Sequence, residues 1–93
     1  MKNLEKTLKD YIVDLEFFLK DPEWDVMEYA IAMVRRNELL SQREKLSREE
    51  INKLREMERE FARRYRDYKV KYMDKGVEEA IEHFIKEITK HPF

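Results

Sequence analysis

Hydrophobic side chains recur with the period of an α-helix through most of the chain, and charged positions fill the intervals between them. When residues 4–20 are placed about 100° apart on a helical projection, most apolar side chains fall on one arc. The members of this arc are Leu4, Leu8, Tyr11, Ile12, Leu15, Phe18 and Leu19. Val13 and Phe17 fall on the opposite side, where a helix covered on one side only carries polar residues.

Residues 22–43 form a second predicted helix, with two apolar stripes instead of one. One stripe contains Val26, Tyr29, Met33 and Leu40, and the other contains Trp24, Met27, Ile31 and Val34. Together the stripes cover about 220° of the circumference, more than a helix with a solvent face normally presents. We therefore expect this helix to be covered on two sides, either at the centre of a bundle or by a second chain.

The third predicted helix, residues 48–75, carries an aromatic ridge on one side. Leu54, Phe61, Tyr65, Tyr68 and Tyr72 fall within an arc of about 60°, with Ile51 and Met57 at its margins. Basic side chains alternate with these rings, so the ridge is either a platform for stacking nucleic-acid bases or the core face of the helix. We favour the core, because the helix has few other apolar residues to hold it to the protein.

A fourth helix is predicted over residues 77–90. Its apolar residues form a single stripe made of Val77, Ile81, Phe84, Ile85 and Ile88. Gly76 precedes this stripe and is expected to end the third helix in a left-handed conformation, which glycine adopts without strain. Pro92 is expected to close the fourth helix, because proline cannot continue a helix.

Two further signals mark helix starts. Asp21 followed by Pro22 combines a capping carboxylate with a proline at the first helical position. Ser47 and Glu50 have the spacing of a capping box, in which each side chain accepts a hydrogen bond from the other residue's free amide. The predicted helices therefore lie near 4–20, 22–43, 48–75 and 77–90.

The composition supports one helical domain over residues 1–93. The chain has one glycine and two prolines, and it is 42% hydrophobic and 44% charged. Few helix breakers and many helix-forming residues favour long helices. We predict an all-α fold, an antiparallel bundle of three to four helices. Because a chain of this size buries only a bit over 60% of its surface on folding, we expect dimerisation to complete the bundle.

The charge balance and the absence of cysteine limit the partners, the metal ligands and the cellular location that we expect for the protein. Twenty Lys and Arg against 21 Asp and Glu give a net charge of -1, so no overall field attracts nucleic acid or an anionic membrane. Without cysteine the chain has no disulfide and no thiolate metal ligand. Residues 29–34 are the longest apolar run, which is too short to span a membrane. We expect a cytoplasmic protein, and the density of charge is typical of thermostable proteins.

An arginine stripe on the third predicted helix supplies the alternative function. The stripe contains Arg48, Arg55, Arg59 and Arg66 but no acidic residue, and residues 48–75 hold ten basic against seven acidic residues, an excess of +3. Such a stripe can bind nucleic acid or another polyanion by neutralising phosphates.

Acidic residues on the same helix favour a solvated charged face instead. Glu49, Glu56, Glu60 and Asp67 form a stripe beside the arginines. The pairs Glu49–Lys53, Glu60–Arg64 and Asp67–Lys71 have the spacing of stabilising intrahelical ion pairs. A helix dedicated to phosphate would gain nothing from an acidic stripe, so polyanion binding stays the second alternative.

Two groups of titratable residues are candidates for chemistry. Glu79, His83, Glu87 and His91 repeat one turn apart on the fourth predicted helix. Imidazoles and carboxylates at that spacing can share a metal ion, but carboxylate sites in bundles draw their ligands from several helices. We interpret this group as a surface stripe.

Glu58 is the second candidate, since it lies inside the apolar arc of the third predicted helix. A carboxylate there is either a buried acid in a cleft or the partner of a buried base. Arg36, at the margin of the second helix's apolar arc, is the expected partner. We predict no catalytic, cofactor-binding or metal-binding residue and no enzymatic activity, because no nucleophile and base occur in a recognisable arrangement.

The leading functional hypothesis is association with another protein chain, either a second copy or a partner in an assembly. It rests on the doubly apolar second helix and on the displaced Val13 and Phe17, because an exposed apolar patch commonly marks an interface. The predicted interface residues are Val13, Phe17, Trp24, Met27, Ile31 and Val34.

Overall fold

The protein is all-helical in the computed structural model, which describes residues 3–20, 26–68 and 75–93, with the side chains of 66–68 and 75 outside the description. Four α-helices follow one another: α1 (Leu4–Lys20), α2 (Val26–Ser41), α3 (Arg48–Tyr68) and α4 (Lys75–Lys90). A short 3-10 helix, η1 (Arg43–Lys45), lies between α2 and α3. No strand occurs in these three ranges, so the predicted all-α class is confirmed.

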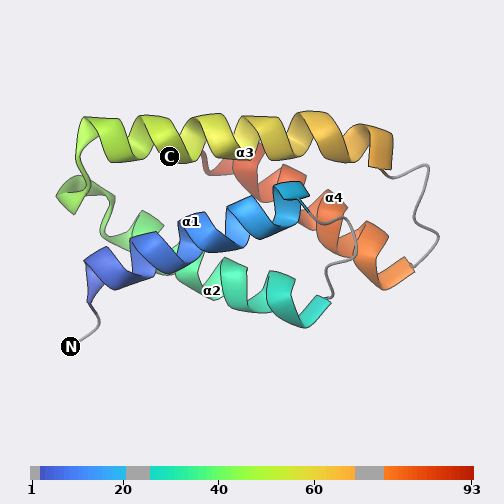
Figure 1. Cartoon of the computed structure of the whole chain (residues 1–93), viewed down its shortest axis with the longest axis horizontal. Coiled ribbons are helices and arrows are strands. Elements are labelled where there is room, and N and C mark those ends of the chain that lie inside the picture. Colours follow the sequence, from blue (N-terminus) through green and yellow to red (C-terminus); the bar gives the residue numbers. More distant parts are fainter. Residues whose placement is uncertain (1–2, 21–25, 69–74) are drawn as a thin grey trace.

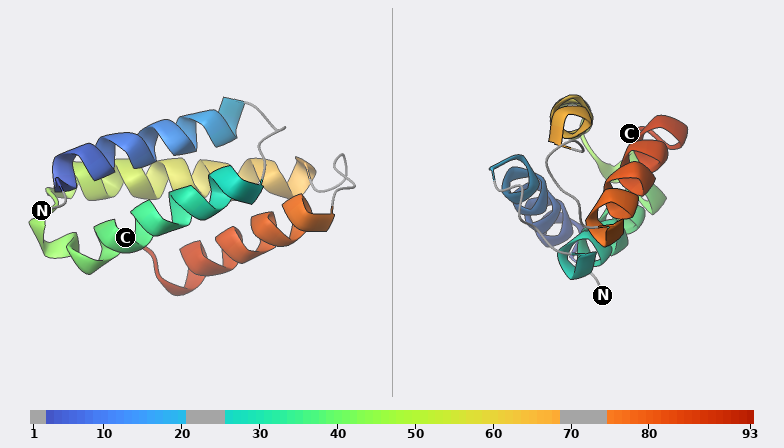
Figure 2. Two further views of the ribbon diagram at one scale, coloured as in Figure 1. Left: turned by 90° about the horizontal axis from the view of Figure 1, so that it is seen from below. Right: turned by 90° about the vertical axis from the view of Figure 1, so that its right-hand side faces the viewer.

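Consecutive helices run in opposite directions, so the chain goes back and forth along one long axis (Figure 1 and Figure 2). Helix α1 packs against α2 and α3, and helix α4 packs against the same two helices. The apolar sides of all four helices therefore face a common interior. Neither α1 nor α2 is enclosed on every side, which leaves their outer surfaces in contact with solvent.

The core is built from the stripes that the periodicity predicts, with aromatic rings at its centre. Phe61 stacks on Tyr65 and on Phe84, with ring centroids 4.1 and 4.5 Å apart. Phe18 meets Phe61 and Phe84 edge-on at 6.1 and 6.3 Å, a favourable arrangement for aromatic quadrupoles. The buried part of the aromatic ridge, Leu54, Phe61 and Tyr65, is fully excluded from solvent. The prediction that the ridge is the core face of the helix is thus confirmed for these three residues. The side chains of Tyr68 and Tyr72 lie outside the description.

Helix α1 has the predicted bounds, and α3 begins where the capping box places it. The Ser47 backbone N–H donates to Glu50 Oε1 at 2.8 Å, and the Glu50 N–H donates to Ser47 Oγ at 3.1 Å. Two amides that have no partner inside the helix are satisfied in this way. The α4 helix ends at Lys90, two residues before Pro92, as predicted.

The end of α2 differs from the prediction by two residues. The helix ends at Ser41 instead of residue 43, and Gln42 leads into η1. The Gln42 N–H donates to the Leu39 carbonyl at 3.2 Å and the Ser41 hydroxyl to the Glu38 carbonyl at 2.7 Å. Bonds to the third preceding residue tighten the last turn and stop α-helical propagation. The predicted start at Asp21 and Pro22 lies outside the described residues.

The prediction for Gly76 is wrong. Gly76 is the second residue of α4, which begins at Lys75, and its φ is not positive. Residue 75, predicted as the end of the third helix, therefore begins α4, two residues before the predicted start at 77. The burial of Ala80 and Ile81 explains the difference, because packing the α4 stripe on the core favours helical backbone through the residues just before it, where one glycine costs only about 1 kcal/mol.

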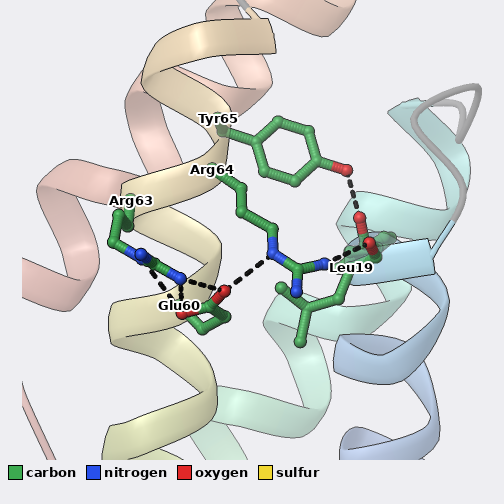
Figure 3. A network of polar contacts seen from close by, with 6 residues as sticks. Leu19, Glu60, Arg63, Arg64 and Tyr65 are labelled. Atoms are coloured by element: carbon green, nitrogen blue, oxygen red, sulfur yellow. Dashed lines mark hydrogen bonds and ion pairs between the residues drawn. The ribbon is translucent and has the colours of Figure 1, made fainter.

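Side chains of α3 close the last turn of α1, as Figure 3 shows. The Tyr65 hydroxyl donates to the Phe18 carbonyl, and Arg64 Nη1 donates to the Leu19 carbonyl at 3.0 Å. These carbonyls belong to the last turn of α1, where no further helical amide follows to bond them. Arg64 is itself held by Glu60, with Nε 2.7 Å from Oε1. The C-terminal end of α1 is therefore fastened to the C-terminal part of α3, which ends at Tyr68.

Candidate protein interface

The outer side of the α1–α2 pair carries large hydrophobic side chains that the chain itself leaves uncovered. Val13 is 56% exposed, Met27 73% and Val34 63%. Phe17 and Ile31 are also exposed. We call Val13, Phe17, Met27, Ile31 and Val34 the α1–α2 apolar face. On each helix these residues lie opposite the buried stripe, so the face points away from the core.

The structure places the sequence-predicted interface residues consistently on this surface. Every predicted residue except Trp24 belongs to the α1–α2 apolar face, and Trp24 lies outside the described residues. We expected the second helix to be covered on two sides, either by its own chain or by another. Its own chain does not cover this side of Val26–Ser41. Val26 departs from its predicted inward stripe and is exposed, because it opens α2 at the edge of the packed arc.

An ion pair joins the two helices beside the apolar face. Arg35 Nη1 lies 2.8 and 2.7 Å from Asp14 Oδ1 and Oδ2. Because α1 and α2 are antiparallel, Phe17 and Ile31 lie on the same side of this pair, one turn along each helix. Burial raises the pKa of Asp14, although the hydrogen bond from Arg35 opposes that rise. The pair is thus partly withdrawn from water before any partner binds.

The predicted contact between Arg36 and Glu58 is present and buried. Arg36 Nε lies 2.8 Å from Glu58 Oε2, and Arg36 Nη2 lies 3.1 Å from Oε1. Both side chains are at most 2% exposed. This bidentate geometry satisfies the charges that burial would otherwise leave unpaired, so the pair belongs to the interior and explains why Glu58 interrupts an apolar arc.

Two residues that the sequence did not single out complete this network. The Tyr11 hydroxyl donates to Glu58 Oε2 at 2.5 Å, and the Arg36 guanidinium carbon lies 5.1 Å from the centroid of the Phe93 ring. Arg36 Nη2 also donates to the His91 carbonyl at 2.8 Å. No signal short of the fold could have found these contacts, because Tyr11 and Glu58 are 47 residues apart.

The network adds to the effect of burial on the pKa of Tyr11 and reverses the effect of burial on the pKa of Arg36. Burial raises the pKa of the Tyr11 hydroxyl well above its ordinary value, and the neighbouring Glu58 carboxylate raises it further. Desolvation lowers the pKa of Arg36, but the hydrogen bond and charge of Glu58 outweigh it and leave a raised pKa. Tyr11 therefore stays a neutral donor and Arg36 a cation, which suits a structural ion pair better than proton transfer.

The arginine stripe is only partly free. Arg48 and Arg59 are exposed, whereas Arg55 is half-buried and its Nε donates to the Phe93 carbonyl. The side chain of Arg66 lies outside the description. The structure therefore does not present the predicted stripe as four equivalent cations.

The intrahelical ion pairs predicted on α3 have different outcomes. The predicted Glu60–Arg64 pair forms at 2.7 Å, and Arg63 joins it at 2.6 Å. Hydrogen bonds from these two arginines lower the pKa of Glu60. No ion pair forms between Glu49 and Lys53 in the described part of α3, and the Asp67–Lys71 pair lies outside it.

In the histidine stripe of α4, His83 contacts Tyr29 of α2. The Tyr29 hydroxyl and His83 Nδ1 share a hydrogen bond, and His83 Nε2 lies 3.8 Å from Glu87 Oε1. His91 is exposed at the end of the helix. Within the residues that the structure describes, no three His, Cys, Asp or Glu side chains are grouped so that they could hold a metal ion.

Two further findings bear on function. None of the helices, over the residues described, combines the length and apolar character needed to cross a bilayer. Comparison of the chain with protein-family models, with curated proteins and with solved structures found no match. The functional proposal therefore rests on the surfaces of the molecule itself.

Proposed function

We propose that this protein acts without enzymatic activity, by helix-to-helix association, and that its partner is a second copy of the same chain. The observation that carries the proposal is the α1–α2 apolar face, with five large hydrophobic side chains exposed on two adjacent helices. Exposed apolar residues scattered singly are normal, but a group on one surface marks an interface.

The charges of the face favour a second copy over an unrelated partner. A two-fold interface brings the same patch together from both chains, so it must be complementary to itself. Beside Phe17 and Ile31, the acid Asp14 and the base Arg35 are already paired at 2.7 Å. This pair is electrically neutral, so it adds no repulsion between like charges when two copies meet at Phe17 and Ile31.

The size of the chain gives the same expectation. A stable interface buries about 800 Å² from each partner, which is a modest share of the 6550 Å² exposed by the described molecule. Burial of apolar side chains contributes about 25 cal/mol for each Å² removed from water. A domain of 93 residues has a small core, so association would add usefully to its stability.

Sedimentation equilibrium of the whole chain at micromolar to millimolar concentration tests the proposal. We expect a mass near twice the 11.6 kDa of one chain, and a single-chain mass for the double variant Ile31→Glu/Val34→Glu. Asn37→Glu is the control for the effect of an added carboxylate, because it places one at an exposed position of the same helix outside the apolar face. A wild-type mass of one chain at every concentration, or unchanged association of the double variant, would overturn the proposal.

A further inference from the structure

A basic groove lies where η1 meets the first two turns of α3, away from the α1–α2 apolar face. Its volume is about 650 Å³, and it is lined by Arg43, Glu44, Leu46, Arg48, Ile51, Asn52 and Arg55. The groove gathers arginines from the 3-10 helix, from the first residue of α3 and from two turns further along. Arg43 was not among the predicted anion-binding residues, because only the turn at Gln42 brings it beside α3.

The cations of this groove are largely unpaired. Neither Arg43 nor Arg48 makes a side-chain hydrogen bond or ion pair with any residue in the described ranges, and both are exposed. Arg55 is held by its Nε bond to the Phe93 carbonyl, which leaves its two terminal nitrogens as donors. Glu44 is the single carboxylate of the lining, so the groove carries a net charge of about +2 on a chain whose net charge is -1.

The placement of Arg48 works against the stability of α3. Arg48 is the first residue of the helix, where the positive end of the helix dipole disfavours a cation. A nearby second cation, Arg43, adds repulsion. The carboxylates of Glu49 and Glu50 already lie in the first turn of the helix, so the main effect of an anion in the groove would be to relieve the repulsion between the two guanidinium groups.

The rest of the lining indicates which kind of anion fits. Leu46 and Ile51 supply apolar walls, and Asn52 adds an amide that can donate or accept. No aromatic ring lines the groove, so nucleobases would find no stacking platform. Arginine forks bind phosphate oxygens in pairs, which favours a ligand that presents phosphates rather than bases.

We propose that this groove binds a compact ligand carrying two or more phosphate groups, held by Arg43, Arg48 and Arg55. The proposal is independent of self-association, because none of these residues belongs to the α1–α2 apolar face. It also revises the predicted polyanion stripe. Arg43 joins the set, whereas Arg59 lines a different and smaller pocket beside Phe93.

Calorimetric titration of the full chain with tripolyphosphate at low salt tests the site. We expect saturable binding to one site per chain, at least tenfold weaker in Arg43→Gln/Arg48→Gln and weaker with added salt. The matched control, Lys53→Gln/Arg59→Gln, removes the same charge from exposed positions of α3 outside the groove and should bind like the wild type. Glu44→Gln should bind more tightly, because it removes the only carboxylate of the lining.

Three results would overturn the proposal. One is the absence of saturable binding up to millimolar tripolyphosphate, and another is an equal loss in the groove and control variants, which would mean diffuse attraction. The third is binding of a single-stranded oligonucleotide with no binding of tripolyphosphate, which would point to nucleic acid instead. Circular dichroism of each variant confirms that the helices are retained, and titration of Ile31→Glu/Val34→Glu should give wild-type binding.

Discussion

A buried guanidinium loses its hydration and needs partners in the protein to compensate. The partners of Arg36 are Glu58, the His91 carbonyl and the Phe93 ring. One nitrogen, Nη1, is buried without a partner in the described structure. Because the desolvation cost of such a pair is close to its electrostatic gain, the pair contributes little net stability, but either charge alone would be costly. The consequence is an asymmetry between single and double substitutions.

Replacing Glu58 by Ala should lower the free energy of unfolding by about 3–5 kcal/mol, because it leaves Arg36 buried and uncompensated. Urea unfolding followed by circular dichroism measures this change. The double variant Arg36→Met/Glu58→Leu should recover part of the loss, since it removes both charges and keeps the volume filled, and only the Tyr11 hydroxyl loses its acceptor. A double variant as unstable as Glu58→Ala would contradict this account of the pair.

Tyr29 should make the protein lose stability in alkali. Burial, and after it the charge of Glu87, raise the pKa of Tyr29 from 10.0 to about 12. Between these values the unfolded chain loses the phenolic proton while the folded chain keeps it, so stability falls as pH rises through this window. Tyr29→Phe cannot lose that proton, and its free energy of unfolding should therefore decline less steeply from pH 10 to 12 than that of the wild type. The free energies come from urea unfolding of both proteins at each pH. An equal decline with pH in the two proteins would show that Tyr29 has the same pKa in the folded and unfolded states.

At the scale of the element, the capping box should account for much of the stability of the start of α3. Ser47→Ala removes the acceptor of the Glu50 amide and should cost about 1 kcal/mol. Ser41→Ala is the matched control, because the Ser41 hydroxyl donates to the Glu38 carbonyl at the other end of a helix and caps no free amide. Chemical denaturation of both variants compares them, and similar losses would argue against a specific role of the box.

Gly76→Ala distinguishes the observed position of Gly76 from the predicted one. In the first turn of α4, with φ not positive, alanine fits without strain and should stabilise the protein by about 0.4–1 kcal/mol through the unfolded state. A left-handed cap at this position would instead make the substitution destabilising. The shift of the denaturation midpoint in urea gives the sign directly.

Periodicity was enough to predict the elements and much of the core, because a stripe of apolar residues at helical spacing has few ways to be buried. It gave the bounds of α1, the start of α3 and the partner of Glu58, since each depends on local spacing or on charge in an apolar arc. Gly76 was assigned wrongly because its backbone follows the packing of α4, which local propensity does not contain. Tyr11, Phe93 and Arg43 were missed because their contacts come from segments far apart or from the turn at η1.

At the scale of the whole molecule, self-association would couple stability to concentration. A dimer is favoured by mass action, so the midpoint of thermal unfolding should rise as wild-type protein is concentrated from micromolar to millimolar. Differential scanning calorimetry should show no such rise for Ile31→Glu/Val34→Glu. A midpoint independent of concentration in the wild type would argue that the α1–α2 apolar face does not join two chains.

The last turn of α1 is completed by donors that arrive 45 residues later in the chain, where Arg64 meets Leu19. That turn cannot acquire its full set of bonds while α1 stands alone, however well its residues favour a helix. During refolding, amide protons there should become protected from exchange together with those of α3, later than the protons in the first half of α1. A ribosome releasing this chain would thus complete its first helix only after most of its third had emerged.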